Sequence, residues 1–224
     1  MSRIEAVIFD YGGVLSTTPF AGIAEFERRM GYPEQSLGQL LFGRGASPQG
    51  PTEDIPDHDW HLLETGRLGL DEFHDRLVAR SQSVLGRRLD LGIYAQFLRE
   101  LGVGIHWMMV HRVRELRAEG YRTAILTNNI KEWGAFWKGS IPLDLFELVV
   151  DSCEVGLRKP DPAIFLLTCE RLGVAPEAAV FLDDTRRHVA AAREVGLRAI
   201  LVSDPLEALA ELDAVLAGGP PGPV

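Results

Sequence analysis

Cysteine is scarce in this chain of 224 residues, which contains only Cys153 and Cys169. Both lie in apolar segments without metal-ligand spacing, so we expect small core residues rather than a disulfide framework. Long hydrophobic runs are also missing, because no window approaches the roughly 18 uninterrupted apolar residues of a membrane span. The amino-terminal MSRIEAVIFD reaches an acid before the apolar part of a signal peptide could form. These absences predict a cytoplasmic protein.

An excess of positive charge is missing as well. The chain has 23 lysine and arginine residues against 32 aspartate and glutamate residues, which gives a formal net charge of −9. This charge repels nucleic acids and anionic membrane surfaces, and no basic run offsets it, so we expect neither as a partner. What the chain does contain is 46% hydrophobic residues, enough for one large domain or for one domain with a substantial insertion.

Five short runs rich in β-branched and apolar residues predict the strands of a parallel sheet. They cover residues 4–9, 122–126, 148–150, 179–182 and 198–202. Apart from the first two, consecutive runs are separated by one helical pattern, which is typical of a sheet covered on both faces. Pro162 begins one such helix, which ends before Gly173, and Thr185 begins another, which stops at Gly196. We predict a doubly wound, Rossmann-like α/β core.

The interval between the first two predicted strands is far longer than the dozen or so residues that a crossover needs. Three helical patterns fill it: IAEFERRM, LDEFHDRLVARSQSVL and LGIYAQFLREL, each followed by a glycine. The stretch at 43–59 is rich in glycine and proline, has no apolar period, and predicts a long loop. We divide the chain into a core of residues 1–16 and 104–217, a helical cap of residues 17–103, and a disordered tail of residues 218–224.

Polar residues follow the predicted strands at their carboxyl ends, where open α/β sheets bind ligands. They are Asp10 after AVIF, Thr127 and Asn128 after TAIL, Lys159 in LRKPDP, and Asp183 and Asp184 after AVFL. Taken singly, Thr127 and Asn128 could equally form a helix cap, and Lys159 could be a solvated surface charge.

Taken together, these residues indicate a site for a metal and a phosphate. Three carboxylates at one edge of a sheet repel one another unless a cation lies among them, and oxygen ligands of this kind suit Mg²⁺. The hydroxyl, amide and ammonium groups then supply donors for a second set of oxygens. The combination favours phosphate chemistry.

The motifs FDYGGVL, ILTNN, RKPDP and FLDD resemble, in this order, the four motifs of the haloacid dehalogenase (HAD) superfamily, subfamily I, with room for a C1 helical cap after the first. The segments TAILTNN, VGLRKPDPAIF and VFLDDT are similar to the corresponding segments of one branch of the superfamily. This branch contains the phosphatase domain of mammalian soluble epoxide hydrolase and bacterial sugar-phosphate phosphatases. The resemblance covers the whole chain. It implies a Mg²⁺-dependent phosphatase that acts on a small phosphorylated metabolite, such as a sugar phosphate.

Position by position, the resemblance implies that Asp10 is the nucleophile and forms an aspartyl-phosphate, which water then hydrolyses. It implies that Mg²⁺ is held by Asp10, the backbone carbonyl of Gly12 and Asp184, with Asp183 assisting directly or through water.

The same resemblance assigns the phosphate donors. Thr127, the backbone of Asn128 and Lys159 would hold the transferring phosphoryl oxygens and offset their charge. His188 stands where the family often has an asparagine or aspartate that orients Lys159 or the waters of the metal. We interpret His188 instead as an exposed helix residue.

Gly12 departs from the family pattern, in which this position is usually an aspartate that protonates the leaving group and then activates water. The glycine carbonyl still serves a metal, but an acid–base contribution of typically about 10²–10⁴ in rate is missing or comes from elsewhere. The departure keeps open a second class of function, a phosphate-binding or scaffold protein with weak or no catalysis. It also argues against a mutase, whose chemistry depends even more on that acid.

A haloacid dehalogenase uses the same nucleophile on carbon without a metal. Members of that type usually lack the acidic pair that Asp183 and Asp184 form here, so we discount this alternative. The cap stretch DIPDHDWH could hold a metal or face the substrate, but we interpret it as a solvated loop that leads into a helix; its polar residues are Asp54, Asp57, His58, Asp59 and His61. We expect a monomer or a homodimer.

Overall fold

The computed structural model describes residues 3–43 and 58–223. The chain divides into two compact units, which we call the core unit (Met1–Thr17 with Ile105–Val224) and the cap unit (Thr18–Gly104). These limits lie one residue further along the chain than the limits predicted for the cap. In the ranges that the structure describes, no helix has the length and apolar character required to cross a membrane.

A five-stranded parallel sheet forms the centre of the core unit, with the strand order β3-β2-β1-β4-β5. The strands are β1 (Ala6–Phe9), β2 (Arg122–Thr127), β3 (Leu148–Asp151), β4 (Ala179–Asp183) and β5 (Arg198–Leu201). All five lie where the sequence predicted strands, with ends that differ by no more than two residues. Phe9 is in register with Ile125 of β2 and Leu182 of β4, so β1 lies in the middle of the sheet.

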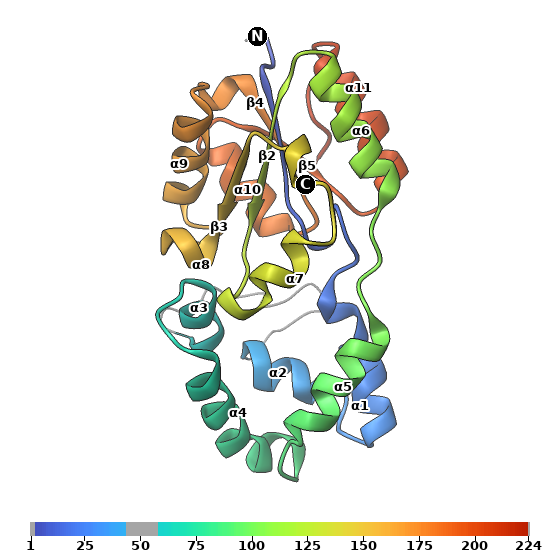
Figure 1. Ribbon diagram of the computed structural model, residues 1–224, viewed down its shortest axis with the longest axis vertical. Helices are drawn as coiled ribbons and strands as arrows, with labels where there is room; N and C mark the ends of the chain where they lie inside the picture. Colours follow the sequence, from blue (N-terminus) through green and yellow to red (C-terminus); the bar gives the residue numbers. More distant parts are fainter. Residues whose placement is uncertain (1–2, 44–57, 224) are drawn as a thin grey trace. The chain divides into compact units, whose positions relative to one another are not determined.

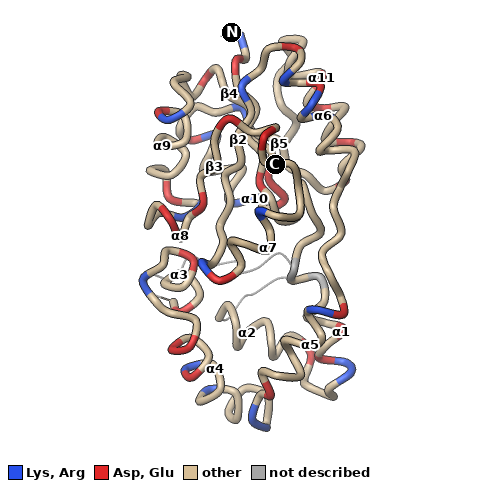
Figure 2. The backbone as a smooth tube through the Cα atoms, in the orientation of Figure 1, with Lys and Arg blue, Asp and Glu red and all other residues tan. Residues whose placement is uncertain are grey.

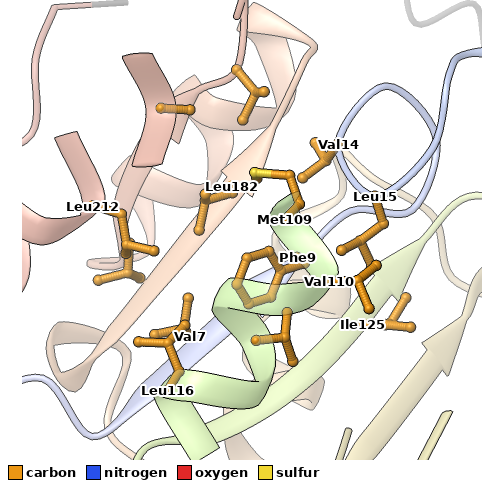
Figure 3. Close-up of a cluster of buried hydrophobic side chains, with 14 of the residues drawn as sticks. Val7, Phe9, Val14, Leu15, Met109, Val110, Leu116, Ile125, Leu182 and Leu212 are labelled. Carbon is orange, nitrogen blue, oxygen red and sulfur yellow. The ribbon is translucent and has the colours of Figure 1, made fainter. Parts of the chain in front are cut away.

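Helices cover both faces of the sheet (Figure 1). On one face lie α6 (Trp107–Ala118) and α11 (Pro205–Leu216), and on the other lie α9 (Pro162–Leu172) and α10 (Arg186–Glu194). Side chains alternate along β1, so Val7 and Phe9 pack with α6 and α11, whereas Ala6 and Ile8 pack with α9 and α10. Figure 3 shows the first of these two clusters, with Val7 and Phe9 beside α6. The predicted doubly wound fold is confirmed.

Short helical turns complete the core unit: η2 (Lys131–Trp133), α7 (Gly134–Lys138), η3 (Leu143–Leu145), α8 (Ser152–Val155) and η4 (Pro176–Ala178). The two helices for which the sequence indicated limits, α9 and α10, lie within those limits. Pro162 lies in the first turn of α9, the Asp161 side chain accepts from the Ala163 N–H at 2.9 Å, and Gly173 ends the helix with a φ of 64°.

The cap unit contains η1 (Pro19–Gly22), α1 (Ile23–Met30), α2 (Ser36–Phe42), α3 (Asp59–Glu64), α4 (Leu70–Leu85) and α5 (Leu91–Leu101). The helices α1, α4 and α5 coincide with the three predicted from the sequence. Most of the loop predicted at 43–59 lies outside the described residues. Buried aromatic rings form much of the core of this unit, as in the edge-to-face pair of Phe42 and Trp60, whose centroids are 5.0 Å apart.

A buried carboxylate supports the amino-terminal end of α2 in the cap unit. Glu27 of α1 accepts from the backbone N–H groups of Gln35 at 2.9 Å and Leu37 at 2.7 Å. These N–H groups have no partner within the helix, so a carboxylate at this end satisfies them and interacts favourably with the helix dipole. The hydrogen bonds join α1 to α2.

The chain leaves the core unit and returns to it at one place. Ser16 forms an antiparallel bridge with Ile105, and the His106 N–H donates to the Leu15 carbonyl at 2.9 Å. The two connections to the cap unit therefore begin side by side.

The carboxyl-terminal tail has no helix or strand over residues 218–223, but hydrogen bonds hold it. The Gly222 N–H donates to Glu211 Oε1 at 2.7 Å, and the Gly222 carbonyl accepts from Arg193 Nη2 at 2.8 Å. The described part of the tail is thus fixed against α10 and α11, which differs from the predicted disorder.

Candidate active site

Three carboxylates gather at the carboxyl ends of β1 and β4. Asp10 directly follows β1, Asp183 ends β4 and Asp184 comes next in the chain. The two strands are neighbours in register, and the Asp10 N–H donates to the Leu182 carbonyl at 2.9 Å. One oxygen from each of the three carboxylates lies within 4.8 Å of the other two. Asp10 and Asp183 are buried, and Asp184 is half-buried.

A buried lysine lies between two of these carboxylates. The Lys159 side chain is fully buried, and its Nζ lies 2.9 Å from Asp10 Oδ2 and 2.6 Å from Asp183 Oδ2. The face of the Phe181 ring lies below it, with the ring centroid 5.4 Å from Nζ. Lys159 is therefore not the solvated surface charge that the residue taken alone suggested.

The loop after β2 fixes the lysine to the sheet. The Lys159 N–H donates to Asn128 Oδ1 at 2.8 Å, and Asn128 Nδ2 donates to the Lys159 carbonyl at 3.0 Å. The family resemblance assigned Asn128 a backbone role, and the sequence gave no sign of this side-chain clamp. Thr127 is buried at the end of β2, two positions beyond the pair of Phe9 and Ile125, so it lies at the same edge of the sheet.

Two glycines, Gly12 and Gly13, follow Asp10 and Tyr11, and the second lies against Asp184. Gly12 forms a parallel bridge with Ser16, and Gly13 has a φ of 79°, a conformation that favours glycine. A Cβ at Gly13 would lie 2.9 Å from the Asp184 Cβ and still closer to the carboxylate itself. Gly13 therefore lets the loop pass directly beside Asp184, a requirement that the sequence analysis missed.

His188 is buried rather than exposed, so the interpretation of this residue from the sequence was wrong. Its Nδ1 lies 3.0 Å from Asp183 Oδ1, and 7% of the residue is exposed. The reason is its position in α10, where His188 shares the buried face with Val189 and Ala192. Together with the Thr185 N–H, which donates to Asp183 Oδ1 at 2.8 Å, His188 holds the Asp183 carboxylate in place.

Burial and charge shift the protonation of this cluster. Burial raises the pKa of Asp10 well above its usual value, although the Lys159 ammonium opposes the shift. Burial and the charge of Asp183 raise the pKa of Asp184 to about 7. Burial also disfavours ionised Asp183, but Lys159 and His188 hold the pKa of Asp183 below its usual range. For Lys159, the two carboxylates outweigh burial and raise its pKa, whereas burial lowers the pKa of His188.

The residues at this edge fit a divalent cation. Three carboxylates face one ammonium group, so a charge of +2 would neutralise the ionised cluster. Burial and the neighbouring carboxylates raise the pKa of Asp10 and of Asp184, and a cation bound between them would oppose this effect. Their oxygens are the ligands that Mg²⁺ prefers.

The Gly13→Ala variant is expected to lose about 1–3 kcal/mol of unfolding free energy because its backbone would be strained. The added Cβ also displaces Asp184, so Mg²⁺ binding measured by calorimetry should weaken. Gly120→Ala is the matched control, because Gly120 also has a positive φ, 92°, but a Cβ added there would have nothing within 4 Å. Equal Mg²⁺ affinities of the two variants would contradict a role for Asp184 in the metal site.

The polar residues of the cap stretch have a structural role where they are described. Asp59 begins α3, is buried, and lies 2.7 Å from both Arg76 Nη1 and Arg80 Nη1. His61 is buried in the same helix, so these two residues are not part of a solvated loop as interpreted from the sequence. Asp54 and Asp57 lie outside the described residues. Figure 2 shows acidic and basic residues distributed over both units, without a continuous basic run in the described part.

The chain belongs to the haloacid dehalogenase-like hydrolase family, whose model matches residues 4–196. This range begins two residues before β1, extends beyond the end of α10 and contains every residue of the site. The resemblance found in the sequence motifs is thereby confirmed, and the protein is a hydrolase of this family.

Several curated proteins are similar over nearly the whole chain. Acyl-CoA dehydrogenase family member 10 of Mus musculus is 31% identical over 94% of this chain and 19% of its own length. Bifunctional epoxide hydrolase 2 of Rattus norvegicus is 28% identical over 95% of this chain and 39% of its own length. Phosphatase MT3486 of Mycobacterium tuberculosis is 28% identical over 97% of this chain and 99% of its own length. The chain therefore spans only a fifth to two fifths of the first two relatives.

Solved structures show the same fold. A HAD family enzyme of Bacteroides thetaiotaomicron, in complex with magnesium and inorganic phosphate, matches with a TM-score of 0.65 and 21% identity over 88% of this chain and 93% of that chain. L-2-haloacid dehalogenase of Xanthobacter autotrophicus, with chloropropionic acid covalently bound, matches with a TM-score of 0.60 and 23% identity over 95% of this chain and 83% of that chain.

Proposed function

We propose that this protein is a Mg²⁺-dependent phosphatase that hydrolyses a small phosphorylated metabolite through an aspartyl-phosphate on Asp10. The observation that carries the proposal is the contact of Asp10 with the buried Lys159 inside a cluster of three carboxylates. A carboxylate nucleophile, a fixed cation and oxygen ligands for a metal are the components that covalent phosphoryl transfer needs. The phosphatase relative that matches along its whole length supports the same reaction class.

In the first step, a carboxylate oxygen of Asp10 attacks phosphorus. The bond between phosphorus and the leaving oxygen breaks, and its electron pair stays on that oxygen. In the second step, water attacks the phosphorus of the aspartyl-phosphate and loses a proton to solvent, which releases inorganic phosphate and restores the Asp10 carboxylate. Lys159 offsets the charge of the transferring phosphoryl oxygens, and Thr127 and the backbone N–H of Asn128 supply further donors.

Mg²⁺ would be held by Asp10, the Gly12 carbonyl and Asp184, and when bound it would withdraw charge from the phosphoryl oxygens. Asp183 has a different part in this proposal. Its two oxygens already accept hydrogen bonds from Lys159, the Thr185 N–H and His188. Asp183 therefore fixes Lys159, and its assistance to the metal goes through water.

A phosphate-binding protein with weak catalysis is the second candidate, and Gly12 is the observation that favours it. Such a protein would bind Mg²⁺ and inorganic phosphate without releasing phosphate from esters. A dehalogenase shares the fold, but its reaction on carbon makes no use of a cation among three carboxylates. Phosphate release and chloride release therefore separate the three functions.

Chelation is expected to stop phosphate release, and added Mg²⁺ to restore it, because Asp10 and Asp184 repel each other without a cation. The measurement is inorganic phosphate released from a panel of phosphorylated metabolites and an aryl phosphate, with chelator or with Mg²⁺. Chloride release from 2-chloropropionate, measured in parallel, is the control for dehalogenation. Phosphate release that does not respond to the chelator would contradict the metal dependence, and metal-independent chloride release would favour the dehalogenase.

A further inference from the structure

We propose that Thr185 is a positioning residue that leaves Asp184 one oxygen for the metal and thereby selects Mg²⁺ over Ca²⁺. The proposal rests on the proposed function, in which Asp184 holds Mg²⁺, and it adds a residue that determines which cation the site takes. The observation that carries it is the hydrogen bond between the Thr185 hydroxyl and the Asp184 carboxylate. It lies at a helix end where such a hydroxyl usually serves the helix.

Thr185 is the residue that directly precedes α10, and its backbone is extended, as is usual at this position. A threonine there typically accepts a hydrogen bond from an N–H group of the first helical turn. The Thr185 side chain accepts no such bond. The side chains at the same position of α9 and α11, Asp161 and Asp204, both do. The Thr185 hydroxyl therefore has a different role from these two side chains.

Thr185 contacts both members of the acidic pair. Its Oγ1 donates to Asp184 Oδ1 at 3.2 Å, and its N–H donates to Asp183 Oδ1 at 2.8 Å. Thr185 thus holds Asp183 through the main chain and Asp184 through the side chain. Because only the contact with Asp184 depends on the side chain, a substitution at Thr185 can remove this contact and leave the Asp183 contact in place.

The two oxygens of Asp184 have different neighbours. Oδ1 accepts the hydroxyl of Thr185, whereas Oδ2 is the atom that would lie nearest to a Cβ added at Gly13. In the ranges that the structure describes, Thr185 is the one other residue that donates a hydrogen bond to this carboxylate. The hydroxyl and the Gly13 backbone together fix the orientation of the carboxylate, and Oδ2 is the oxygen that remains for a cation.

The other two carboxylates use both of their oxygens in contacts with the protein. Asp10 Oδ1 accepts from the Tyr11 N–H at 2.7 Å, and Asp10 Oδ2 lies 2.9 Å from Lys159 Nζ. Both oxygens of Asp183 accept hydrogen bonds as well. None of these contacts involves the Thr185 side chain. A change in cation preference on substitution of Thr185 therefore reports on Asp184.

The number of oxygens that Asp184 offers distinguishes the two cations. Mg²⁺ requires near-ideal octahedral geometry at short distances, which a carboxylate held in one orientation suits. Ca²⁺ takes more oxygens in a flexible arrangement and often uses both oxygens of one carboxylate. Because Thr185 engages Oδ1, Asp184 can give Ca²⁺ a second oxygen only if this hydrogen bond breaks. The hydrogen bond therefore disfavours Ca²⁺ and supports Mg²⁺.

The experiment measures the binding of Mg²⁺ and of Ca²⁺ to the metal-free protein by calorimetry, for the wild type, Thr185→Val and Thr185→Ser. Valine has the shape of threonine without the hydroxyl, and serine keeps the hydroxyl. Loss of a group that orients a metal ligand typically lowers affinity by about 10–100-fold. We expect this loss for Mg²⁺ in Thr185→Val, with Ca²⁺ bound nearly as well as before. Thr185→Ser should keep the preference of the wild type.

Thr168→Val is the matched control. It makes the same change at a buried threonine of α9, whose hydroxyl donates to the Ile164 carbonyl at 2.7 Å, and it should leave the cation preference unchanged. A merely structural role of Thr185 at the start of α10 would weaken the binding of both cations alike and lower the urea midpoint of the metal-free protein. We expect the urea midpoint of Thr185→Val to equal that of the wild type, because no hydrogen bond of the helix end is removed.

The outcomes separate this proposal from the proposed function. If Thr185→Val binds Mg²⁺ as the wild type does, or loses affinity for both cations equally, the proposal is overturned and the proposed function stands. If the folded wild type binds no Mg²⁺, the metal dependence of the proposed function fails, and this proposal fails with it. If Thr185→Val does not fold, Thr185→Ala is measured in its place. Failure of both variants to fold would overturn the proposal, because the fold itself would then require the hydroxyl.

Discussion

Asp10→Asn is expected to lower the turnover of every phosphate substrate by about 10⁴-fold or more, because loss of a covalent nucleophile removes the whole reaction path. The variant should keep its fold. Since burial raises the pKa of Asp10, ionisation of this carboxyl at neutral pH opposes folding of the metal-free protein, and a neutral amide removes that opposition. The melting temperature of metal-free Asp10→Asn should therefore equal or exceed that of the wild type.

Asp151→Asn is the matched control for this variant. Asp151 is also a buried carboxylate at the carboxyl end of a strand, and it accepts from the Cys153 N–H at 3.4 Å rather than from Lys159. Burial raises the pKa of Asp151 as well, so in both variants a neutral amide replaces a carboxyl group whose ionisation opposes folding. Asp151→Asn should retain turnover. Phosphate release by purified Asp10→Asn at a comparable rate would rule out the aspartyl-phosphate.

Lys159→Met is expected to have the largest effect on stability, a loss of about 3–5 kcal/mol in the free energy of unfolding, because it leaves two buried carboxylates without their cation. Methionine has nearly the length of lysine, so the cavity is small. Turnover of the folded fraction should fall by about 10²–10³, the effect of removing one group that offsets charge on the transferring phosphoryl oxygens. Urea unfolding without Mg²⁺ measures the first effect, and single-turnover kinetics measure the second.

Lys138→Met controls for the loss of a lysine that has an acidic partner. Lys138 pairs with Glu154 near the surface, and such pairs contribute about 0–1 kcal/mol. The double variant Lys159→Met with Asp183→Asn should recover part of the lost stability, because it removes one of the two unpaired charges. If Lys159→Met and Lys138→Met have the same free energy of unfolding, the buried ion pairs of Lys159 do not stabilise the fold.

The sheet could be predicted because a parallel strand that is buried on both faces has a continuous run of apolar residues. In this chain a polar residue follows each of these runs. That pattern placed Asp10, Thr127, Lys159, Asp183 and Asp184 at one edge of the sheet without any coordinates. The contacts among them depend on register, which strand patterns do not supply. The roles of the cap unit residues are harder to predict, because helical periodicity indicates which face of a helix is buried but not which helix packs against it.

The residues that the sequence analysis missed act through side-chain directions and backbone angles. Asn128 clamps the lysine segment from a different strand, and no local pattern connects positions that far apart. Gly13 needs its positive φ because Asp184 lies against it, and a pair of glycines alone does not reveal which one is required. His188 left a usable signal, since its spacing from Ala192 places both on one face of α10.

The bridge between Ser16 and Ile105 has a consequence for how this protein could acquire different specificities. It brings together the two ends of the Thr18–Gly104 segment. Pairing of these ends carries the entropic cost of closing the segment into a loop. Doubling the length of a closed segment adds only about 0.6 kcal/mol to that loss. Every hydrogen bond described here for Asp10, Lys159 and Asp183 joins groups of the core unit. We therefore expect that segments of other lengths and folds can be accommodated at this point without a change in these hydrogen bonds of the core unit.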